Sequence, residues 1–250
     1  MKLKKERKDY LKEILYTIPV TDAFKKGCEC PLCSMYHELE TASIEYTMGP
    51  SYMEDDVRAE TDKTGFCQKH IKMMYHNQNR LGLSLILSTH MDHTMETIEK
   101  LIKGVKPAGS SLFKKAPYSD IKSYIDRMEH SCFVCNRIHQ TFERYLATVL
   151  YLYKTEPDFK EIFRNSKGFC TKHYGELYQK GSETFNRKLL DSFIEDLNSI
   201  YLTNMKRVRE DLEWFKDKFD YRYQNEPWKN SRDALPRTMM KINSVLTDEE

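Results

Sequence analysis

The sequence predicts an all-α protein made of two pseudo-repeated helical modules, each stapled by a Cys3His metal site, with a long C-terminal helix. Three observations predict this fold class. The 250 residues include only 9 Gly and 8 Pro, too few turn-forming residues for a many-stranded sandwich or barrel. Apolar residues recur at helical spacing over long stretches. Cysteine and histidine motifs occur twice, in the same order.

Composition and charge exclude several classes of protein. Hydrophobic residues make up 40% of the chain, which is enough for a packed core and excludes a mostly disordered protein. Lys and Arg total 40 against 38 Asp and Glu, a net charge of +2 that argues against nucleic-acid binding as the main role. The longest apolar stretch, 81–87, is far shorter than the roughly 20 residues that cross a membrane. The basic start, 2–8, has no apolar signal core behind it, so we expect a cytoplasmic protein.

The cysteines belong to an internal repeat. A Cys-x-x-Cys motif at 30–33 is followed by Gly-Phe-Cys-x-Lys-His at 65–70, and both motifs recur at 132–135 and 168–173. This duplication pairs six of the seven cysteines and leaves Cys28 over. The domains expected from it are a first module at 1–104, a linker rich in Gly, Pro and Ser at 105–118, a second module at 119–222 and a C-terminal strap at 223–250 with a short final helix.

Helices are expected around each motif. One helix follows each Cys-x-x-Cys, at about 31–47 and 133–153, and another begins at each Cys-x-Lys-His, at about 67–78 and 170–180. The last long segment, about 183–219, predicts a helix roughly 55 Å long at 1.5 Å per residue. Its apolar stripe steps by three or four residues through Leu189, Phe193, Leu197, Tyr201, Met205, Val208, Leu212, Phe215 and Phe219. So long a helix needs partners, which suggests an unknown protein partner or self-association along it.

Each repeat is expected to form its own metal site. Two ligands at positions i and i+3 on the first turn of a helix can point at one ion, and the helix dipole favours the thiolate form. Three thiolates and one imidazole are typical of closed structural zinc sites, so we expect two Zn²⁺ per chain. The predicted ligands are Cys30, Cys33, Cys67 and His70 in the first repeat and Cys132, Cys135, Cys170 and His173 in the second. An iron–sulfur cluster, a redox dithiol and ordinary buried cysteines stay open as alternatives.

Weaker signals surround these motifs. Glu54, Asp55, Asp56 and Arg58 could act in acid–base chemistry or bind a hard cation, although a solvated turn that caps a helix explains them as well. Three side chains at helical spacing, those of His90, His93 and Glu96, could hold a further metal or form a polar helix face.

Other residues near the motifs have two interpretations each. Cys28 is a spectator thiol near the site, or else an alternate ligand or a redox-sensitive thiol. His37 and His139 follow each Cys-x-x-Cys by one helical turn. They could hydrogen-bond to the metal ligands, or they could be buried polar residues without such a role. Basic and aromatic residues alternate at 222–232, which suits nucleic acid or a strap packed on the body.

The motifs resemble those of an uncharacterised bacterial family that is filed as a domain of unknown function, with members of about this length. The resemblance covers nearly the whole chain and includes residues 16–20, 30–33, 49–58, 65–70 and 79–83 and the second pair of motifs. It implies a bacterial, cytoplasmic protein and supplies no activity, substrate or partner.

Three functions follow as hypotheses. The leading one is a binding or regulatory protein with two structural zinc sites. The second is an enzyme, either with an exchangeable metal position and a base among Glu54, Asp55 and Asp56, or with a cleft between the modules in which Arg58 and Arg80 meet an anion. The third is an iron–sulfur or thiol redox sensor, and nucleic-acid binding is disfavoured because no continuous basic face is visible.

Overall fold

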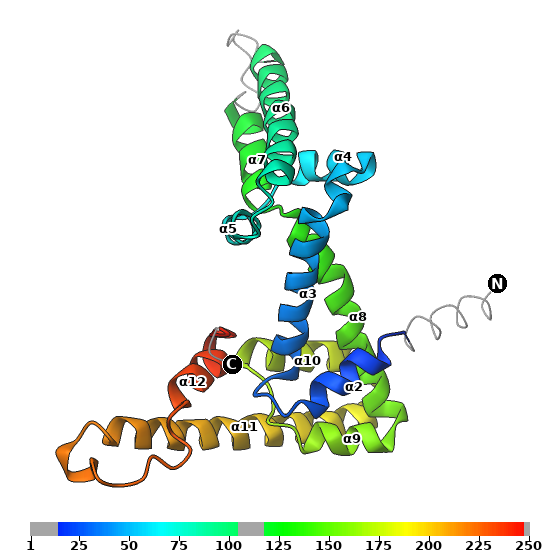
Figure 1. The fold of residues 1–250 in the computed structure, drawn as a ribbon. Helices are drawn as coiled ribbons and strands as arrows, with labels where there is room; N and C mark the ends of the chain where they lie inside the picture. Colours follow the sequence, from blue (N-terminus) through cyan, green and yellow to red (C-terminus); the bar gives the residue numbers. More distant parts are fainter. Residues whose placement is uncertain (1–14, 105–117, 248–250) are drawn as a thin grey trace, which may run out of the picture. The chain divides into compact units, whose positions relative to one another are not determined.

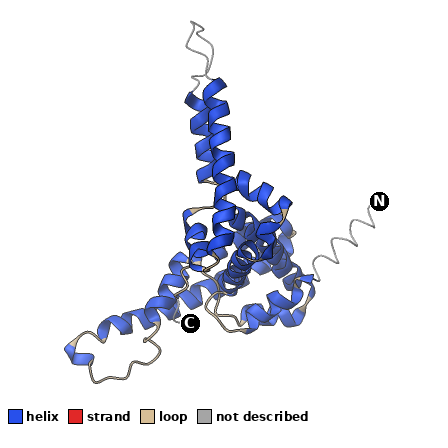
Figure 2. Ribbon diagram, turned by 45° about the horizontal axis from the view of Figure 1, so that its top comes forward, coloured by secondary structure: helices blue, strands red, loops and turns tan. Residues whose placement is uncertain are grey.

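The computed structural model describes residues 15–104 and 118–247. Within these ranges the secondary structure is helical, with no strand (Figure 2). The α-helices are α2 (Thr17–Lys25), α3 (Pro31–Met48), α4 (Asp55–Thr64), α5 (Gln68–His76), α6 (Arg80–Gly104), α7 (Tyr118–Glu129), α8 (Phe133–Thr155), α9 (Pro157–Arg164), α10 (Thr171–Thr184), α11 (Arg187–Asp217) and α12 (Ala234–Asn243). Two 3-10 turns, η1 (Pro50–Met53) and η2 (Tyr221–Tyr223), complete the described elements.

The order of the helices repeats along the chain (Figure 1). The series α2 to α6 corresponds to the series α7 to α11. A Cys-x-x-Cys lies at the start of the second helix of each series, and a Cys-x-Lys-His lies at the start of the fourth. The all-α fold and the long helix near the C-terminus are therefore confirmed. Helix α12 follows the second series and has no counterpart after the first in the described part of the chain.

The chain divides into two compact units, which do not coincide with the two sequence repeats. Unit 1 comprises 1–37 and 142–250, and unit 2 comprises 38–141. The chain passes from unit 1 into unit 2 within α3 and returns within α8. The linker expected at 105–118 lies, up to residue 117, outside the described residues.

Aromatic side chains fill the core of unit 1. The rings of Phe163 and Phe169 are 5.4 Å apart, and that of Phe24 on α2 lies 5.8 Å from Phe163. Tyr153 on α8 contacts Phe193 on α11 edge to face, with ring centroids 5.0 Å apart. These side chains are almost fully buried, and their packing joins α2, α8, α9 and α11 around the loop that precedes α10.

Unit 2 is held mainly by α4 and α6. Val57 on α4 and Leu83 and Ile86 on α6 are buried. A hydroxyl on α6 reinforces the contact, since Thr89 donates to the Asp62 carboxylate of α4 at 2.6 Å. Gly82 allows a close approach, because a Cβ there would lie 2.9 Å from the Tyr52 ring.

Most helix limits agree with the sequence prediction to within a few residues. The largest differences are of four residues: α10 ends at Thr184 instead of about 180, and α11 begins at Arg187 instead of about 183. The Asn186 side chain accepts a hydrogen bond from the Leu189 amide at 3.1 Å, so it caps α11 and separates that helix from α10.

The apolar stripe of α11 is used within unit 1. Phe193, Leu197 and Val208 are buried, and α9, α10 and α12 pack against this helix. The stripe that suggested self-association is thus covered in part by the chain itself, whereas Phe219 at its end is exposed. No helix in the described part of the chain has both the length and the apolar character needed to cross a membrane.

Candidate metal centres

All four cysteine and histidine motifs lie at helix N-termini. Cys30 and Cys132 directly precede the first residues of α3 and α8, and Cys67 and Cys170 occupy the N-cap positions of α5 and α10. The second ligand of each pair lies three residues further, on the first turn. Because helix N-termini carry partial positive charge, the helix dipole contributes favourably to a thiolate at each cysteine of these motifs.

The structure gathers the eight predicted side chains into two groups, but it does not pair them as the sequence suggested. The first cluster consists of Cys30, Cys33, Cys170 and His173, and the second cluster consists of Cys67, His70, Cys132 and Cys135. Each cluster takes its Cys-x-x-Cys from one repeat and its Cys-x-x-His from the other. The expectation that each repeat closes its own site is therefore wrong. Each cluster lies wholly within one compact unit, the first in unit 1 and the second in unit 2.

Helix length explains the exchange. The 18 residues of α3 extend about 27 Å and the 23 residues of α8 about 35 Å, at 1.5 Å per residue. Each helix starts at a Cys-x-x-Cys in one unit and ends in the other unit. The Cys-x-x-His of the same repeat therefore lies in the unit that the helix has entered. In that unit, the Cys-x-x-Cys comes from the other repeat.

The ligand atoms of the first cluster converge on one point. The Nδ1 atom of His173 lies 3.4 Å from the Cys30 sulfur, 3.3 Å from that of Cys33 and 3.2 Å from that of Cys170. The sulfurs of Cys33 and Cys170 are 3.6 Å apart. All four residues are buried.

The second cluster has the same arrangement. The Nδ1 atom of His70 lies 3.3, 3.2 and 3.3 Å from the sulfurs of Cys67, Cys132 and Cys135. The sulfurs of Cys67 and Cys135 are 4.0 Å apart. Unlike any ligand of the first cluster, Cys67 and Cys135 are partly exposed.

These distances fit a single tetrahedral ion. Zinc bonds of about 2.3 Å to sulfur and 2.0–2.1 Å to nitrogen place two sulfurs about 3.8 Å apart and a sulfur about 3.6 Å from a nitrogen. The observed separations lie within a few tenths of an ångström of these values, and the ligand atoms of each cluster all lie within 4.8 Å of one another. Each cluster can therefore hold one metal ion.

Electrostatics in the second cluster favour a cation at its centre. Burial, reinforced by the charge of Cys132, raises the pKa of Cys135 to about 12. Burial also opposes ionisation of Cys132, but the hydrogen bond with His70 and the backbone hydrogen bonds at Cys135 and Cys67 together outweigh it and lower the pKa of that thiol to about 6. For His70, burial opposes the charged form, whereas contacts with Cys132 and Glu40 raise the pKa to about 9. One thiolate and one imidazolium are thus favoured without an ion, and a dication would allow all three thiols to ionise.

The first cluster shows the same conflict among its thiols. Burial raises the pKa of Cys30 to about 12, and hydrogen bonds with Cys170 and Cys30 raise that of Cys33 further. Hydrogen bonds with the side chains of Cys30 and Cys33 lower the pKa of Cys170. Three sulfurs this close cannot all carry charge unless a cation lies among them.

A carboxylate supports the histidine of the second cluster. The Nε2 atom of His70 donates to Glu40 Oε1 at 2.9 Å, and Lys69 contacts the same oxygen at 2.6 Å. Glu40 is buried on α3, but the nearest ligand in sequence, Cys33, belongs to the other cluster, so no motif spacing revealed this carboxylate in the sequence. A carboxylate in this position fixes the ring orientation and leaves Nδ1 free to bind a metal.

The equivalent support in the first cluster is looser. The Nε2 atom of His173 lies 3.9 Å from Glu176 Oε2, and both atoms are buried without a hydrogen-bond partner. The pair has the chemistry of the His70–Glu40 contact but is about 1 Å too long for a direct hydrogen bond.

Helix α12 closes the first cluster, which the sequence did not reveal. The Ser244 hydroxyl donates to the Cys170 sulfur at 3.1 Å. The ammonium of Lys241, which is only 1% exposed, donates to the carbonyls of Glu29 at 2.7 Å and Lys167 at 2.6 Å. Those two carbonyls belong to the two loops that carry the ligands, so α12 joins the loops. The only sequence signal is that Lys241 lies seven residues after Ala234 and therefore on the same helix face as this apolar residue.

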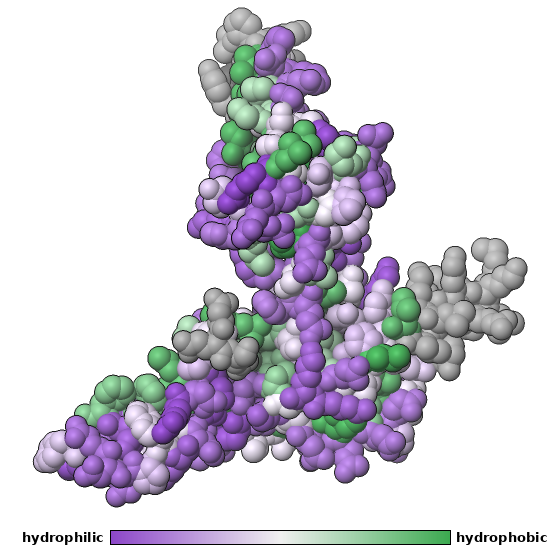
Figure 3. Space-filling model, in the orientation of Figure 1, coloured by the Kyte–Doolittle hydropathy of each residue, from purple (hydrophilic) through white to green (hydrophobic). Residues whose placement is uncertain are grey.

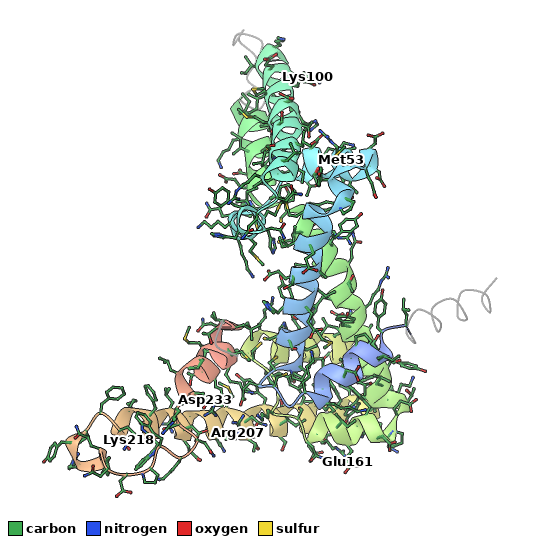
Figure 4. The ribbon with its side chains drawn as sticks, in the orientation of Figure 1. Met53, Lys100, Glu161, Arg207, Lys218 and Asp233 are labelled. Carbon is green, nitrogen blue, oxygen red and sulfur yellow. The ribbon has the colours of Figure 1, made fainter. Side chains whose placement is uncertain are left out.

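An ion pair anchors the same junction to α11. Arg207 donates to Glu29 Oε2 at 2.6 Å, and Lys241 lies 3.2 Å from the same oxygen. Figure 4 labels Arg207 on α11 and Asp233 at the start of α12, the two helices that enclose this network. Burial lowers the pKa of Lys241 despite the nearby Glu29 carboxylate.

The acidic run is not part of either cluster. Glu54, Asp55 and Asp56 are exposed at the N-terminus of α4, directly after Met53, which Figure 4 labels. Asp56 accepts from the Val57 amide at 2.9 Å, and Arg58 is half-buried on the same helix. Acidic residues in a first helical turn interact favourably with the helix dipole, which is a sufficient account of this run.

The other candidates are also separate from the clusters. The Nδ1 atom of His90 donates to the Asp62 carbonyl oxygen at 2.8 Å. Within the described residues, His90, His93 and Glu96 do not form a group that could hold a metal ion. His37 and His139 are exposed, so neither interpretation offered for them is correct. Cys28 belongs to neither cluster, and its sulfur lies 4.0 Å from the Ala23 carbonyl oxygen.

The strap residues at 222–232 pack within unit 1. Arg222 pairs with Asp220 at 2.7 Å, Trp214 donates to the Pro227 carbonyl at 2.9 Å, and the Lys229 ammonium lies 3.7 Å from the Trp214 ring centre. These basic and aromatic groups are occupied by one another, as in the strap interpretation. The basic residues 2–8 lie outside the described residues.

Comparison with known proteins gives one match. Neither the curated proteins nor the solved structures contain one that matches this chain. A family model does match, over residues 11–249, which is nearly the whole length. The chain therefore belongs to the family of unknown function DUF6062.

Proposed function

We propose that this protein is a binding or regulatory scaffold whose two helical units are each held by a structural Cys3His zinc site. The observation that carries the proposal is the closed ligand set of each cluster: three sulfurs and one imidazole nitrogen surround a single point. Four protein ligands complete a tetrahedron and leave no position for water or substrate, which is how structural sites differ from catalytic ones.

Zinc is favoured over an iron–sulfur cluster for a geometric reason. Sulfur–sulfur separations of 3.6 and 4.0 Å suit ligands of one ion. In a [4Fe–4S] cluster each protein ligand binds a different iron, and in a [2Fe–2S] cluster two ligands bind each iron, so the four ligand atoms would not all lie within 4.8 Å of one another as they do here. The imidazole in each set also matches the Cys3His composition common among structural zinc sites.

A catalytic role receives less support. The acidic residues proposed as a base are exposed at the start of α4, where they form a helix terminus instead of facing a ligand set. On the face seen in Figure 3 the surface is mostly hydrophilic, with small and separate hydrophobic patches.

We propose the cytoplasm as the compartment, because zinc-binding thiols need reducing conditions.

The experiment is a metal analysis of protein purified without oxygen and without added metal, together with an absorption spectrum. The expected result is two zinc ions per chain and no visible absorbance. The Cys28→Ser variant is the matched control, since it removes a thiol outside both clusters and should keep both ions. Iron with a visible chromophore, or a chain without metal, would contradict the proposal.

A further inference from the structure

The two clusters differ in their access to solvent. The three cysteines of the first cluster are buried, with Cys30 at 0%, Cys33 at 4% and Cys170 at 0% exposure. In the second cluster Cys132 is buried, whereas Cys67 and Cys135 are partly exposed. Reagents that attack thiolates therefore reach the second cluster more easily.

Helix α12 accounts for the protection of the first cluster. Ser244, the C-cap residue directly after α12, donates to the Cys170 sulfur, and a hydrogen bond of this kind withdraws electron density from a thiolate. The Thr171 hydroxyl, next to Cys170, donates to the Lys241 carbonyl at 3.1 Å and holds the helix against α10. Together with the Lys241 bridge between the two ligand loops, these contacts cover and fasten the first cluster.

The second cluster joins its two ligand loops without such a cover. Ser131 donates to the Thr64 carbonyl at 2.5 Å, and the Phe133 amide donates to the Gly65 carbonyl at 2.9 Å. These bonds link the loops directly and leave two of the three sulfurs partly open. Within the described residues, unit 2 has no helix that corresponds to α12.

We propose that the second cluster is an oxidation site, at which a peroxide converts Cys67 and Cys135 to a disulfide and releases the metal ion, while the first cluster keeps its ion. This inference rests on the proposed function, because it requires both clusters to hold zinc. The two sulfurs that react are the exposed pair, 4.0 Å apart.

The chemistry balances with hydrogen peroxide as the oxidant. One thiolate attacks the peroxide, breaks its O–O bond and becomes a sulfenic acid, with release of hydroxide. The second thiolate then displaces hydroxide from that sulfur and forms the disulfide. Two thiolates lose two electrons in total, and the peroxide becomes two hydroxide ions, which the acid form of the buffer protonates to two water molecules. The metal ion, left with Cys132 and His70 alone, dissociates into solution.

The experiment treats the full-length zinc-loaded protein with hydrogen peroxide and follows free zinc with a colorimetric chelator. We expect the zinc ion of the second cluster to be released on the order of tenfold faster than the ion of the first cluster, because susceptibility to oxidation follows thiolate exposure. Mass spectrometry of the fast phase should find a disulfide between Cys67 and Cys135 and unmodified Cys30, Cys33 and Cys170. Reduction of the disulfide and addition of zinc should restore the ion of the second cluster.

Two variants test the role of α12. Ser244→Ala removes the hydrogen bond to Cys170 and should speed the slow phase while leaving the fast phase unchanged. Ser199→Ala, at an exposed position of α11, is the matched control and should change neither phase.

The outcomes separate this inference from the proposed function. Protein that carries no zinc before peroxide is added contradicts the proposed function and the inference together. Protein with two zinc ions that releases both at one rate, loses the first cluster sooner, forms no disulfide at Cys67 and Cys135, or resists peroxide overturns the inference alone.

Discussion

At the scale of single residues, both clusters depend on the orientation of one imidazole. His70 and His173 both direct Nδ1 at three sulfurs, so the opposite nitrogen must carry a proton and find an acceptor. Glu40 supplies that acceptor for His70 at 2.9 Å from a buried position on α3. The carboxylate therefore positions a ligand without touching the metal site.

Replacing Glu40 should weaken zinc binding in unit 2. Because removal of a carboxylate behind a ligand histidine commonly costs 10–100-fold in metal affinity, Glu40→Ala should weaken the second site by about that factor. Glu40→Gln, which keeps a hydrogen-bond acceptor, should recover part of the loss. Competition with a chelator of known affinity measures the effect, and Glu45→Ala, exposed on the same helix, is the control. Equal affinity of Glu40→Ala and the unaltered protein would show that the contact has no positioning role.

A second residue-scale prediction concerns pH. Burial, and then the hydrogen bond that Tyr153 donates to Asp196 at 2.5 Å, raises the pKa of Tyr153 to about 12. The folded state therefore holds this proton more tightly than the unfolded state, in which the pKa is about 10. The resulting stabilisation is complete below pH 10 and is lost as the pH rises through 12, at a cost on the order of 2 kcal/mol.

Tyr153→Phe isolates this contribution. The variant should be about 1 kcal/mol less stable near neutral pH, because it lacks the hydrogen bond, and its stability should fall less between pH 10 and 12. Denaturant unfolding of both proteins across that range measures the difference. Parallel curves would mean that Tyr153 does not titrate differently in the folded state.

At the scale of elements, the site is built from the starts of helices. The turns before α5 and α10 each need a glycine, Gly65 and Gly168, with φ of +64° and +80°. At Gly168 a Cβ would also lie 3.2 Å from the Ile200 side chain and 3.3 Å from its carbonyl. The turn thus combines a left-handed backbone with close packing on α11, two residues before a ligand.

Gly168→Ala should therefore destabilise unit 1 by more than about 1 kcal/mol, because the new side chain strains the backbone and meets α11. Gly175, within α10, has open space around it and is the matched control. Gly175→Ala should stabilise the protein by about 0.5–1 kcal/mol, as expected for an unstrained helical glycine. Thermal unfolding of the two variants distinguishes the effects, and equal shifts of the same sign would refute the account of this turn.

The helices were predictable where one local signal decides them. Cys-x-x-Cys before an apolar period marked the starts of α3 and α8, and the stripe from Leu189 marked α11. The start of α11 was missed because Asn186 caps the helix through its side chain, inside a run without Gly or Pro. The role of α12 was missed because a lysine is ordinarily exposed, whereas Lys241 is buried by three oxygen partners supplied by distant loops.

At the scale of the whole molecule, the two repeats exchange their metal-binding halves. The ligands themselves could be predicted, because Cys33 and His70 belong to motifs whose spacing suits zinc. Their pairing could not, because Cys33 can share an ion with His70 or His173 with equal chemical ease. The pairing follows from the passage of α3 and α8 from one compact unit into the other, which the spacing of the motifs does not specify.

This exchange has a consequence for stability. Each unit contains segments from both repeats, so neither repeat includes a complete cluster. A metal ion in each unit ties segments that lie more than 60 residues apart in the chain, and closing such long loops is where a metal contributes most to folding.

Metal content of two double variants tests the exchange most directly. Cys33→Ser with His173→Ala removes two ligands of one cluster and should leave one zinc ion per chain. Cys33→Ser with His70→Ala damages both clusters and should leave none, while each single variant retains one. The reverse result, with one ion kept by Cys33→Ser/His70→Ala and none by Cys33→Ser/His173→Ala, would show that each repeat closes its own site and would contradict the account.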